Sequence, residues 1–188
     1  GDGYSEALLE EAERRALPNI RTMVDAASAL TTDKSVALFE RFVIYTRVEL
    51  ESREEIVYET YAKSINIEAK TMIGMARKLY IPAVVKYERT LAETVNNVKA
   101  AGSDAAAVSR ILSEVSALLA ETLDAVENLE KISGEAKSMS YGKEQAVFYR
   151  DKVVPAMALL RSPVDKLETL VDKRMWPVPT YEDLMFEV

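Results

Sequence analysis

Acidic side chains that could bind a hard metal ion gather in residues 49–68. The six glutamates of this stretch are Glu49, Glu51, Glu54, Glu55, Glu59 and Glu68. A helical di-iron site would combine such carboxylates with Glu-x-x-His motifs, but the chain contains no histidine. The glutamates also lack the spacing of a dedicated calcium loop. We interpret them as a solvated helix face, with i,i+4 ion pairs from Glu49 to Arg53 and from Glu59 to Lys63.

Other chemistries lack the residues that they need. The chain has no cysteine and no histidine, which excludes thiolate or imidazole metal sites and serine–histidine or cysteine–histidine catalysis. No glycine-rich phosphate loop is present, and Gly74 stands alone in a helical pattern, where we expect it to allow close helix packing. Glu68 lies at the edge of an apolar stripe, where we expect it to hydrogen-bond a neighbouring helix or the longer protein from which this chain derives, and not to act as a catalytic base. We predict no catalytic, cofactor-binding or metal-binding residue in this chain.

The composition indicates an ordered domain with a real core. The 188 residues are 48% hydrophobic and include only six glycines and six prolines, which argues against disorder. The net charge is −7 and the basic residues are dispersed, so we expect no nucleic-acid partner. The apolar runs are too short to span a membrane and no signal peptide is visible, so we expect a cytoplasmic protein. We interpret Gly1, which replaces an initiator methionine, as a processing or tag scar.

Apolar spacing of three to four residues predicts an all-α fold, an elongated antiparallel helical bundle with kinked long helices. The first helix should begin at Ser5 and stop at Pro18, and residues 19–45 should form short helices joined by Thr31 and Thr32. We divide the chain into short N-terminal helices (1–45), a long-helix bundle (46–175) and a proline-stiffened C-terminal segment (176–188).

Three long helices account for residues 46–175. The first starts at a capping box of Thr46 and Glu49, is kinked at Pro82 and ends before Gly102. The second starts at Ser103 or Asp104, carries a near-heptad apolar seam with Thr122 as a polar exception, and closes at Gly134. The third runs from about Lys143 to Met175. Its expected interruptions are Pro155 and Pro163.

Residues 76–91 and 148–163 resemble each other, because each places a basic residue before an apolar-Pro-Ala step. Two kinked helices that bend together around a shared core explain the likeness. A duplicated ligand site beside Pro82 and Pro155 is the alternative.

The C-terminal segment holds apolar residues behind Pro177 and Pro179. Thr180 and Asp183 could form a capping box for one last turn. That turn either folds back on the bundle or docks onto another domain or subunit, since exposed apolar patches are rare on monomers. The candidate interface residues are Trp176, Tyr181, Leu184, Met185 and Phe186.

Four separated motifs, in this order, give the chain a family resemblance. They are ELESREE, INIEAKTM, KVVPAM and WPVPTYEDLMF, and with them the chain resembles the C-terminal region of type III glutamine synthetases over nearly its whole length. The resemblance implies a parent enzyme that condenses glutamate with ammonia, uses ATP and magnesium, and assembles as a double-ring homo-oligomer. It also implies an upstream catalytic domain in the same polypeptide that carries the ligands, so we transfer no catalytic residue to this chain.

We therefore expect a non-catalytic helical domain that stabilises the subunit or its ring contacts. Two alternatives stay open. One is a free-standing interaction module that binds another protein through residues 176–188. The other is a small-molecule sensor bundle that uses space beside Pro82 and Pro155.

Overall fold

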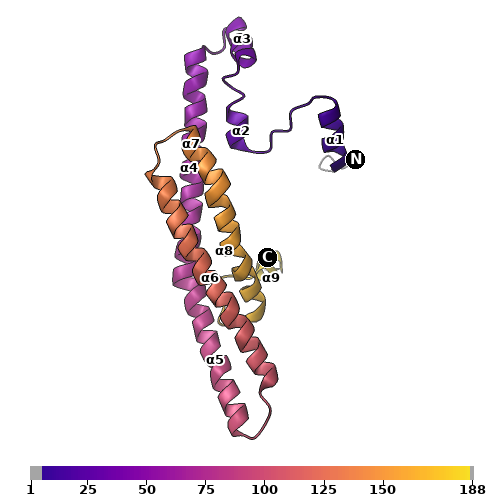
Figure 1. Ribbon diagram of the computed structural model, residues 1–188, viewed down its shortest axis with the longest axis vertical. Helices are drawn as coiled ribbons and strands as arrows, with labels where there is room; N and C mark the ends of the chain where they lie inside the picture. Colours follow the sequence, from indigo (N-terminus) through magenta and orange to yellow (C-terminus); the bar gives the residue numbers. More distant parts are fainter. Residues whose placement is uncertain (1–5, 187–188) are drawn as a thin grey trace. The chain divides into compact units, whose positions relative to one another are not determined.

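The computed structural model describes residues 6–186, and this part of the chain is helical without a strand. It confirms the predicted all-α class (Figure 1). Two compact units are formed, one by residues 1–63 with 140–147 and one by residues 64–139 with 148–188. The helices are α1 (Glu6–Arg14), α2 (Met23–Ala27), α3 (Asp33–Arg41), α4 (Arg47–Met75), η1 (Ala76–Tyr80), α5 (Ile81–Ala100), α6 (Ala106–Ser138), α7 (Lys143–Phe148), η2 (Tyr149–Val153), α8 (Val154–Leu170) and α9 (Tyr181–Phe186).

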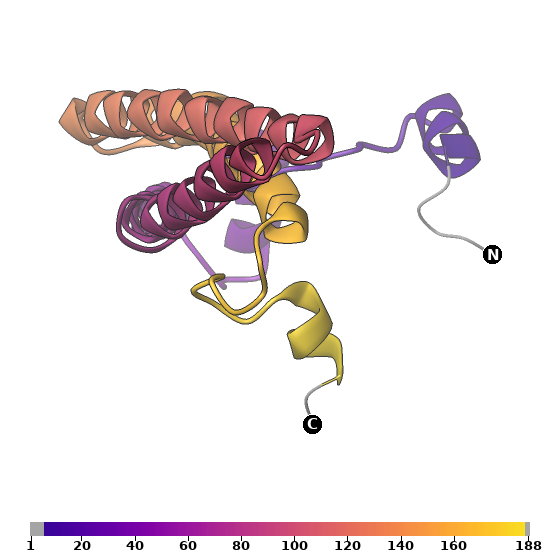
Figure 2. The same cartoon turned by 90° about the horizontal axis from the view of Figure 1, so that it is seen from below.

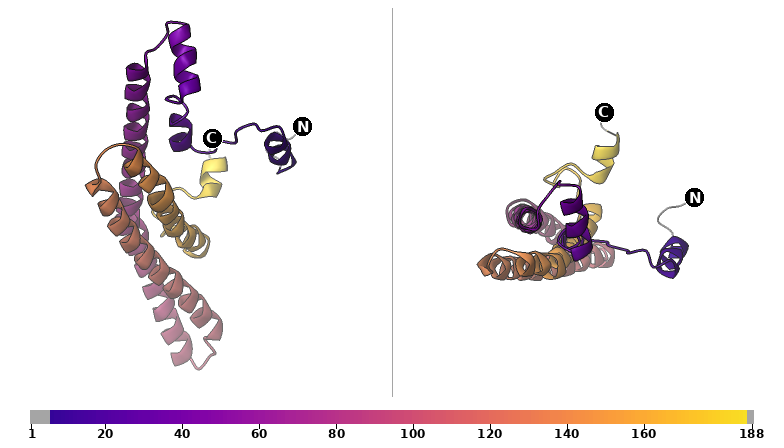
Figure 3. Two further views of the ribbon diagram at one scale, coloured as in Figure 1. Left: turned by 45° about the horizontal axis from the view of Figure 1, so that its top comes forward. Right: turned by 90° about the horizontal axis from the view of Figure 1, so that it is seen from above.

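The core of the first unit joins α2, the first part of α4 and α7. Val24, Ala27, Tyr58 and Ala146 are buried together there, and Figure 3 shows α2 alongside α4. The Tyr58 hydroxyl donates to Glu54 Oε1 at 2.6 Å and lies 2.7 Å from Ser28 Oγ. This buried hydroxyl therefore keeps its hydrogen bonds, as a stable core requires.

Threonines precede α3 and α4, and the sequence predicts the one at Thr46. The Thr32 hydroxyl accepts the Ser35 N–H at the start of α3. At the start of α4, the Thr46 N–H donates to Glu49 Oε2 at 2.8 Å and the Glu49 N–H donates to Thr46 Oγ1 at 3.4 Å. This reciprocal pair is the predicted capping box. The expected cap at Ser5 lies outside the described residues, and α1 ends at Arg14, before Pro18.

Helix α3 ends at a strained residue. The Val43 N–H donates to the Glu40 carbonyl and the Ile44 N–H donates to the Phe39 carbonyl, which is the Schellman pattern of a helix C-terminus. This pattern places Val43 at φ 55°, a left-handed conformation that β-branched residues rarely adopt. The side chain of Val43 is 92% exposed, so its packing does not compensate for the backbone strain.

Replacing Val43 with glycine is expected to raise the free energy of unfolding by about 0.5–1 kcal/mol. The left-handed conformation costs an L-residue about 1–2 kcal/mol, and the greater freedom of glycine in the unfolded chain offsets part of the gain. Urea unfolding measures the change. Val48→Gly is the matched control, since Val48 is 73% exposed but lies inside α4, and this change should destabilise by about 0.5 kcal/mol. If both changes lowered the free energy of unfolding equally, the proposed backbone strain at Val43 would be contradicted.

In the second unit, α6 packs against both α5 and α8. Helices α5 and α6 run side by side in opposite directions (Figures 1 and 2). The predicted seam of α6 is buried at Val115, Leu118 and Leu129. Thr122, the polar exception, is also fully buried, and its hydroxyl donates to the Leu118 carbonyl at 2.7 Å. The hydroxyl is therefore satisfied within its own helix and does not disturb the seam.

Glycine and aspartate mark the turn between α5 and α6. Gly102 has φ 78° and follows the end of α5, with the Gly102 N–H bound to the Lys99 carbonyl and the Ser103 N–H bound to the Val98 carbonyl. This is a Schellman motif closed by glycine, as predicted. Asp104 Oδ1 accepts the Ala106 N–H at 2.9 Å at the start of α6. The sequence therefore located this turn correctly.

Four local predictions are wrong. Gly134 does not close α6, which continues to Ser138. Pro163 does not interrupt α8 but lies buried inside it, and α8 ends at Leu170, before Met175. A Cβ atom built at Gly74 would meet nothing within 4 Å, so Gly74 does not mark a close helix contact. At Gly134 and Pro163 the buried neighbours of the helix outweigh a weak helix-breaking signal.

The expected kinks at Pro82 and Pro155 take the form of π-helical turns. The Ile81 N–H bonds to the Ala76 carbonyl after η1, and the Val154 N–H bonds to the Tyr149 carbonyl after η2, each five residues back. A wider turn suits proline, which cannot donate to the helix and whose ring crowds the preceding turn. Both π-turns contact α6. The two similar sequence stretches thus form the same backbone feature around one shared helix.

Candidate interface at the closing segment

The closing segment, residues 171–186, leaves α8 through a turn built on Asp172. The Asp172 carbonyl accepts the Met175 N–H at 2.8 Å and the Trp176 N–H at 3.1 Å. Its carboxylate accepts the Arg174 N–H at 2.8 Å and the Arg174 guanidinium at 2.9 Å. These bonds to Arg174 lower the pKa of Asp172 to about 2. The turn therefore redirects the chain before Pro177 and delivers Trp176 to the helices.

Trp176 anchors the closing segment on the second unit. Its side chain is only 7% exposed, and its ring stacks on Tyr80 with centroids 5.1 Å apart and an interplanar angle of 18°. The indole Nε1 is buried without a hydrogen-bond partner in the described structure. The buried apolar area of the indole and its stacking on Tyr80, not a hydrogen bond, therefore hold Trp176 in place.

Polar contacts fix helix α9 after this anchor. The Thr180 N–H donates to Asp183 Oδ2 at 3.0 Å and the Asp183 N–H donates to Thr180 Oγ1 at 3.2 Å, so the predicted capping box forms. The Lys173 ammonium pairs with the other oxygen of Asp183. The Tyr181 N–H donates to Glu168 Oε1 at 3.0 Å. The Arg161 guanidinium donates to the Tyr181 hydroxyl and also lies 6.0 Å from the centre of its ring.

The apolar side chains of α9 stay outside these contacts. Leu184, Met185 and Phe186 are 70%, 74% and 75% exposed, and Tyr181 is half exposed. Figure 2 shows the loop that carries the chain from α8 to α9. The five candidate residues therefore divide: Trp176 is buried in its own unit, Tyr181 is tied to α8, and the last three form an apolar patch. That this patch forms an interface stays a prediction.

Acid is expected to loosen the closing segment. Bonds from Lys173 and Thr180 lower the pKa of Asp183 to about 2 from an ordinary 3.8, as Arg174 does for Asp172. Because the ionised forms are favoured in the folded chain, their contribution is complete above about pH 3.8 and disappears as the pH falls through about 2.

The fluorescence of Trp176, the only tryptophan, measures this loosening across the same pH range. The double variant Asp172→Asn/Asp183→Asn should show part of the change already at neutral pH and respond less to acid. An acid response of equal size in both proteins would contradict the role of these two carboxylates.

The glutamates of residues 49–68 do not form a reactive site. Glu59 pairs with Lys63 at 2.6 Å, as predicted. Arg53 instead lies over the ring of Tyr45, with 4.2 Å from its Cζ to the centroid. Glu68 is exposed and forms no hydrogen bond to another described residue, so the expected link to a neighbouring helix is not formed, and a contact with the longer protein stays a prediction. Among residues 6–186 no three carboxylates converge as metal ligands would.

Sequence reasoning missed the residues that hold α9. Arg161 and Glu168 lie on the preceding helix, 20 and 13 residues before Tyr181, and nothing in their local pattern separates them from ordinary surface charges. The Thr180–Asp183 spacing was the only signal available from the segment itself. The placement of α9 therefore required the structure.

The fold and the closing segment together define a class: an all-α domain with an exposed apolar patch on its last helix and, among its described residues, no group of three or more potential metal ligands. Residues 1–99 match the family model described as the glutamine synthetase C-terminal domain. The chain belongs to this family.

Curated relatives agree with this assignment. The chain is 32% identical to a type-3 glutamine synthetase of Dictyostelium discoideum, with 99% of the chain and 26% of the relative aligned. It is 33% identical to a glutamine synthetase of Butyrivibrio fibrisolvens, with 100% of the chain and 27% of the relative aligned. A glutamine synthetase of Bacteroides fragilis is 29% identical over 99% of the chain and 26% of its own length. The chain thus spans about a quarter of each relative.

None of the helices among residues 6–186 combines the length and the apolar character that crossing a bilayer requires.

Proposed function

We propose that this chain is a non-catalytic domain of a longer glutamate–ammonia ligase, and that it stabilises contacts between that enzyme's parts or subunits. The observation that carries the proposal is the apolar patch of Leu184, Met185 and Phe186. Its helix is held by a hydrogen bond from the Tyr181 N–H to Glu168 of α8 and by an ion pair between Asp183 and Lys173, which follows α8, so the patch is presented in a defined position. A preorganised apolar patch loses little freedom on docking and is therefore suited to an interface.

The described residues do not fit the ATP and divalent metal that the resemblance implies for the parent enzyme. No three carboxylates converge among residues 6–186, and the sequence has no glycine-rich phosphate loop. The proposal therefore assigns nucleotide, metal and glutamate binding to the rest of the longer protein. The partners proposed for this domain are that upstream part and further copies of the same cytoplasmic enzyme.

A second apolar surface supports a docking role. Phe42, Val43 and Ile44 are 62%, 92% and 56% exposed at the end of α3. Val43 is also the strained residue described above, and strain that the fold itself does not need is common at functional positions. Covering this surface in the longer enzyme would remove apolar area from water and offset the local strain.

The test uses the full-length enzyme. Replacing Leu184, Met185 and Phe186 with serine should weaken its assembly, since about 1–2 kcal/mol is lost for each apolar side chain that an interface no longer buries. Mass photometry over a dilution series measures the shift from oligomer to smaller species. The rate of glutamine formation by the remaining oligomer should be unchanged.

Ile67→Ser with Val85→Ser is the control, because these two residues are 64% and 49% exposed on other helices. Those changes should leave the oligomer intact. Equal dissociation by patch and control variants, or none by either, would contradict a docking role for the patch. Deleting the whole domain without any effect on assembly, stability or turnover would contradict the proposal altogether.

A further inference from the structure

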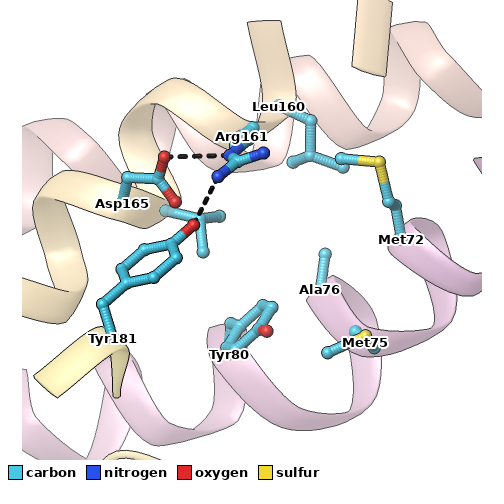
Figure 4. Close-up of a pocket in the computed structure, with 9 residues that line it drawn as sticks. Met72, Met75, Ala76, Tyr80, Leu160, Arg161, Asp165 and Tyr181 are labelled. Carbon is cyan, nitrogen blue, oxygen red and sulfur yellow. Dashed lines mark hydrogen bonds and ion pairs between the residues drawn. The ribbon is translucent and has the colours of Figure 1, made fainter. Parts of the chain in front are cut away.

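A cavity of about 160 Å³ opens beside η1 in the second unit (Figure 4). Its floor is apolar and comes from two helical stretches that are distant in the sequence. The floor residues are Met72, Met75, Ala76, Leu160 and Val164. Methionine side chains adapt their shape to a bound group, and π-turns such as η1 often lie at functional positions. Neither Pro82 nor Pro155 lines this cavity, so it is not the space that the sequence analysis expects beside these prolines.

The mouth of the cavity is polar but nearly charge-neutral. Arg161 Nε donates to Asp165 Oδ2 at 3.1 Å, and the same guanidinium donates to the Tyr181 hydroxyl. Tyr80 also lines the cavity, and its hydroxyl forms no hydrogen bond to another described residue. Burial, then the charges of Glu168, Tyr181 and Asp165, raise the pKa of Tyr80. Tyr80 is therefore a neutral donor, and the same carboxylates disfavour an anion here.

The size of the cavity restricts what can bind. An apolar cavity of about 150 Å³ accepts benzene, whereas drug-sized ligands occupy about 300–1,000 Å³. A nucleotide is therefore too large. Glutamate and 2-oxoglutarate each carry two carboxylates, and the guanidinium at this mouth already pairs with Asp165. Size and charge both favour a small uncharged ligand.

We propose that this cavity binds a small neutral molecule that has one aromatic ring or branched hydrocarbon group and a single hydroxyl or amide. The hydrocarbon part fills the floor between Met72 and Leu160, and the polar atom accepts a hydrogen bond from the Tyr80 hydroxyl. The cavity shares Tyr181 with α9, but none of its lining residues belongs to the patch of Leu184, Met185 and Phe186.

Benzyl alcohol is the probe, added to the 188-residue chain with ¹³C-labelled methionine methyl groups. A dissociation constant on the order of 1 mM is expected for so few atoms. The ring should shift the methyl signals of Met72 and Met75, while Met23 and Met139, which do not line the cavity, serve as internal controls. Benzoate, of similar size but anionic, should bind at least about ten-fold more weakly.

Two variants make the result decisive. Ala76→Leu fills the floor and should abolish the shifts at Met72 and Met75, with Trp176 fluorescence reporting that the fold is kept. Tyr80→Phe keeps the ring stacked on Trp176. It should weaken the binding of benzyl alcohol about five-fold and leave the affinity for toluene unchanged, because toluene has no hydroxyl. The proposal is overturned if benzyl alcohol shifts all methionine signals equally, or shifts none of them at about 20 mM. It is also overturned if Ala76→Leu binds benzyl alcohol as well as the unchanged chain does, or if Tyr80→Phe changes the affinities for benzyl alcohol and toluene equally.

Discussion

Replacing Leu160 with alanine is expected to lower the free energy of unfolding by about 3 kcal/mol. Leu160 is 2% exposed on the buried side of α8, and truncating a buried leucine costs about 2–5 kcal/mol through lost burial and the space left behind. Leu160 also lines the cavity beside η1, so the removed atoms would enlarge an existing space that the surroundings do not fill. Urea unfolding, followed by circular dichroism, measures the loss.

Leu159→Ala is the matched control for this experiment. The two leucines are adjacent in α8, but Leu159 is 62% exposed. Its truncation removes little buried area and introduces the best helix former, so the stability should stay within about 0.5 kcal/mol. If both changes lowered the free energy of unfolding by similar amounts, Leu160 would not lie on the buried side of α8.

Replacing Trp176 with alanine is expected to cost about 3 kcal/mol and to free the closing segment. The indole is 7% exposed and stacks on Tyr80, and loss of a buried tryptophan commonly costs about 3–5 kcal/mol. We expect a value at the lower end of this range because the buried Nε1–H has no hydrogen-bond partner among the described residues. Removing an unsatisfied buried donor is itself stabilising and offsets part of the lost free energy. Urea unfolding gives the stability, and limited proteolysis after Lys173 and Arg174 reports release of the segment.

Trp176→Phe separates the stacked ring from the indole nitrogen. Phenylalanine keeps an aromatic face for Tyr80 and removes the unpaired donor, so this change should cost less than about 1 kcal/mol. A loss as large as that of Trp176→Ala would mean that the indole N–H, and not the ring, holds the segment.

The anchor and the apolar patch have different expected effects in the longer enzyme. Trp176→Ala should weaken both the domain and its docking, because Leu184, Met185 and Phe186 depend on the anchored segment for their position. Serine at these three exposed positions should affect docking while the stability of the 188-residue chain stays nearly the same. Comparing the two variants therefore distinguishes a structural tail from an interface.

Local patterns predicted the helices well because their signals are complete within a few residues. The capping box of Thr46 and Glu49, the Schellman glycine at Gly102 and the seam of α6 each depend on neighbours in the sequence. Gly134 and Pro163 misled the prediction for the opposite reason. A helix breaker costs about 1–3 kcal/mol, and burial of residues on both sides, such as Leu160 and Leu167 around Pro163, outweighs that cost.

Apolar spacing and helix caps in the sequence predicted the all-α class, four motifs placed the chain in the glutamine synthetase family, and residues 176–186 already showed several apolar side chains. Which of these apolar residues are covered depends on the packing of distant helices. Trp176 is buried because Tyr80 lies where it can stack, and α9 turns Leu184 to Phe186 outward because Arg161 and Glu168 hold its other side. These partners come from distant parts of the chain, and their charges and rings acquire a role only when folding brings them together.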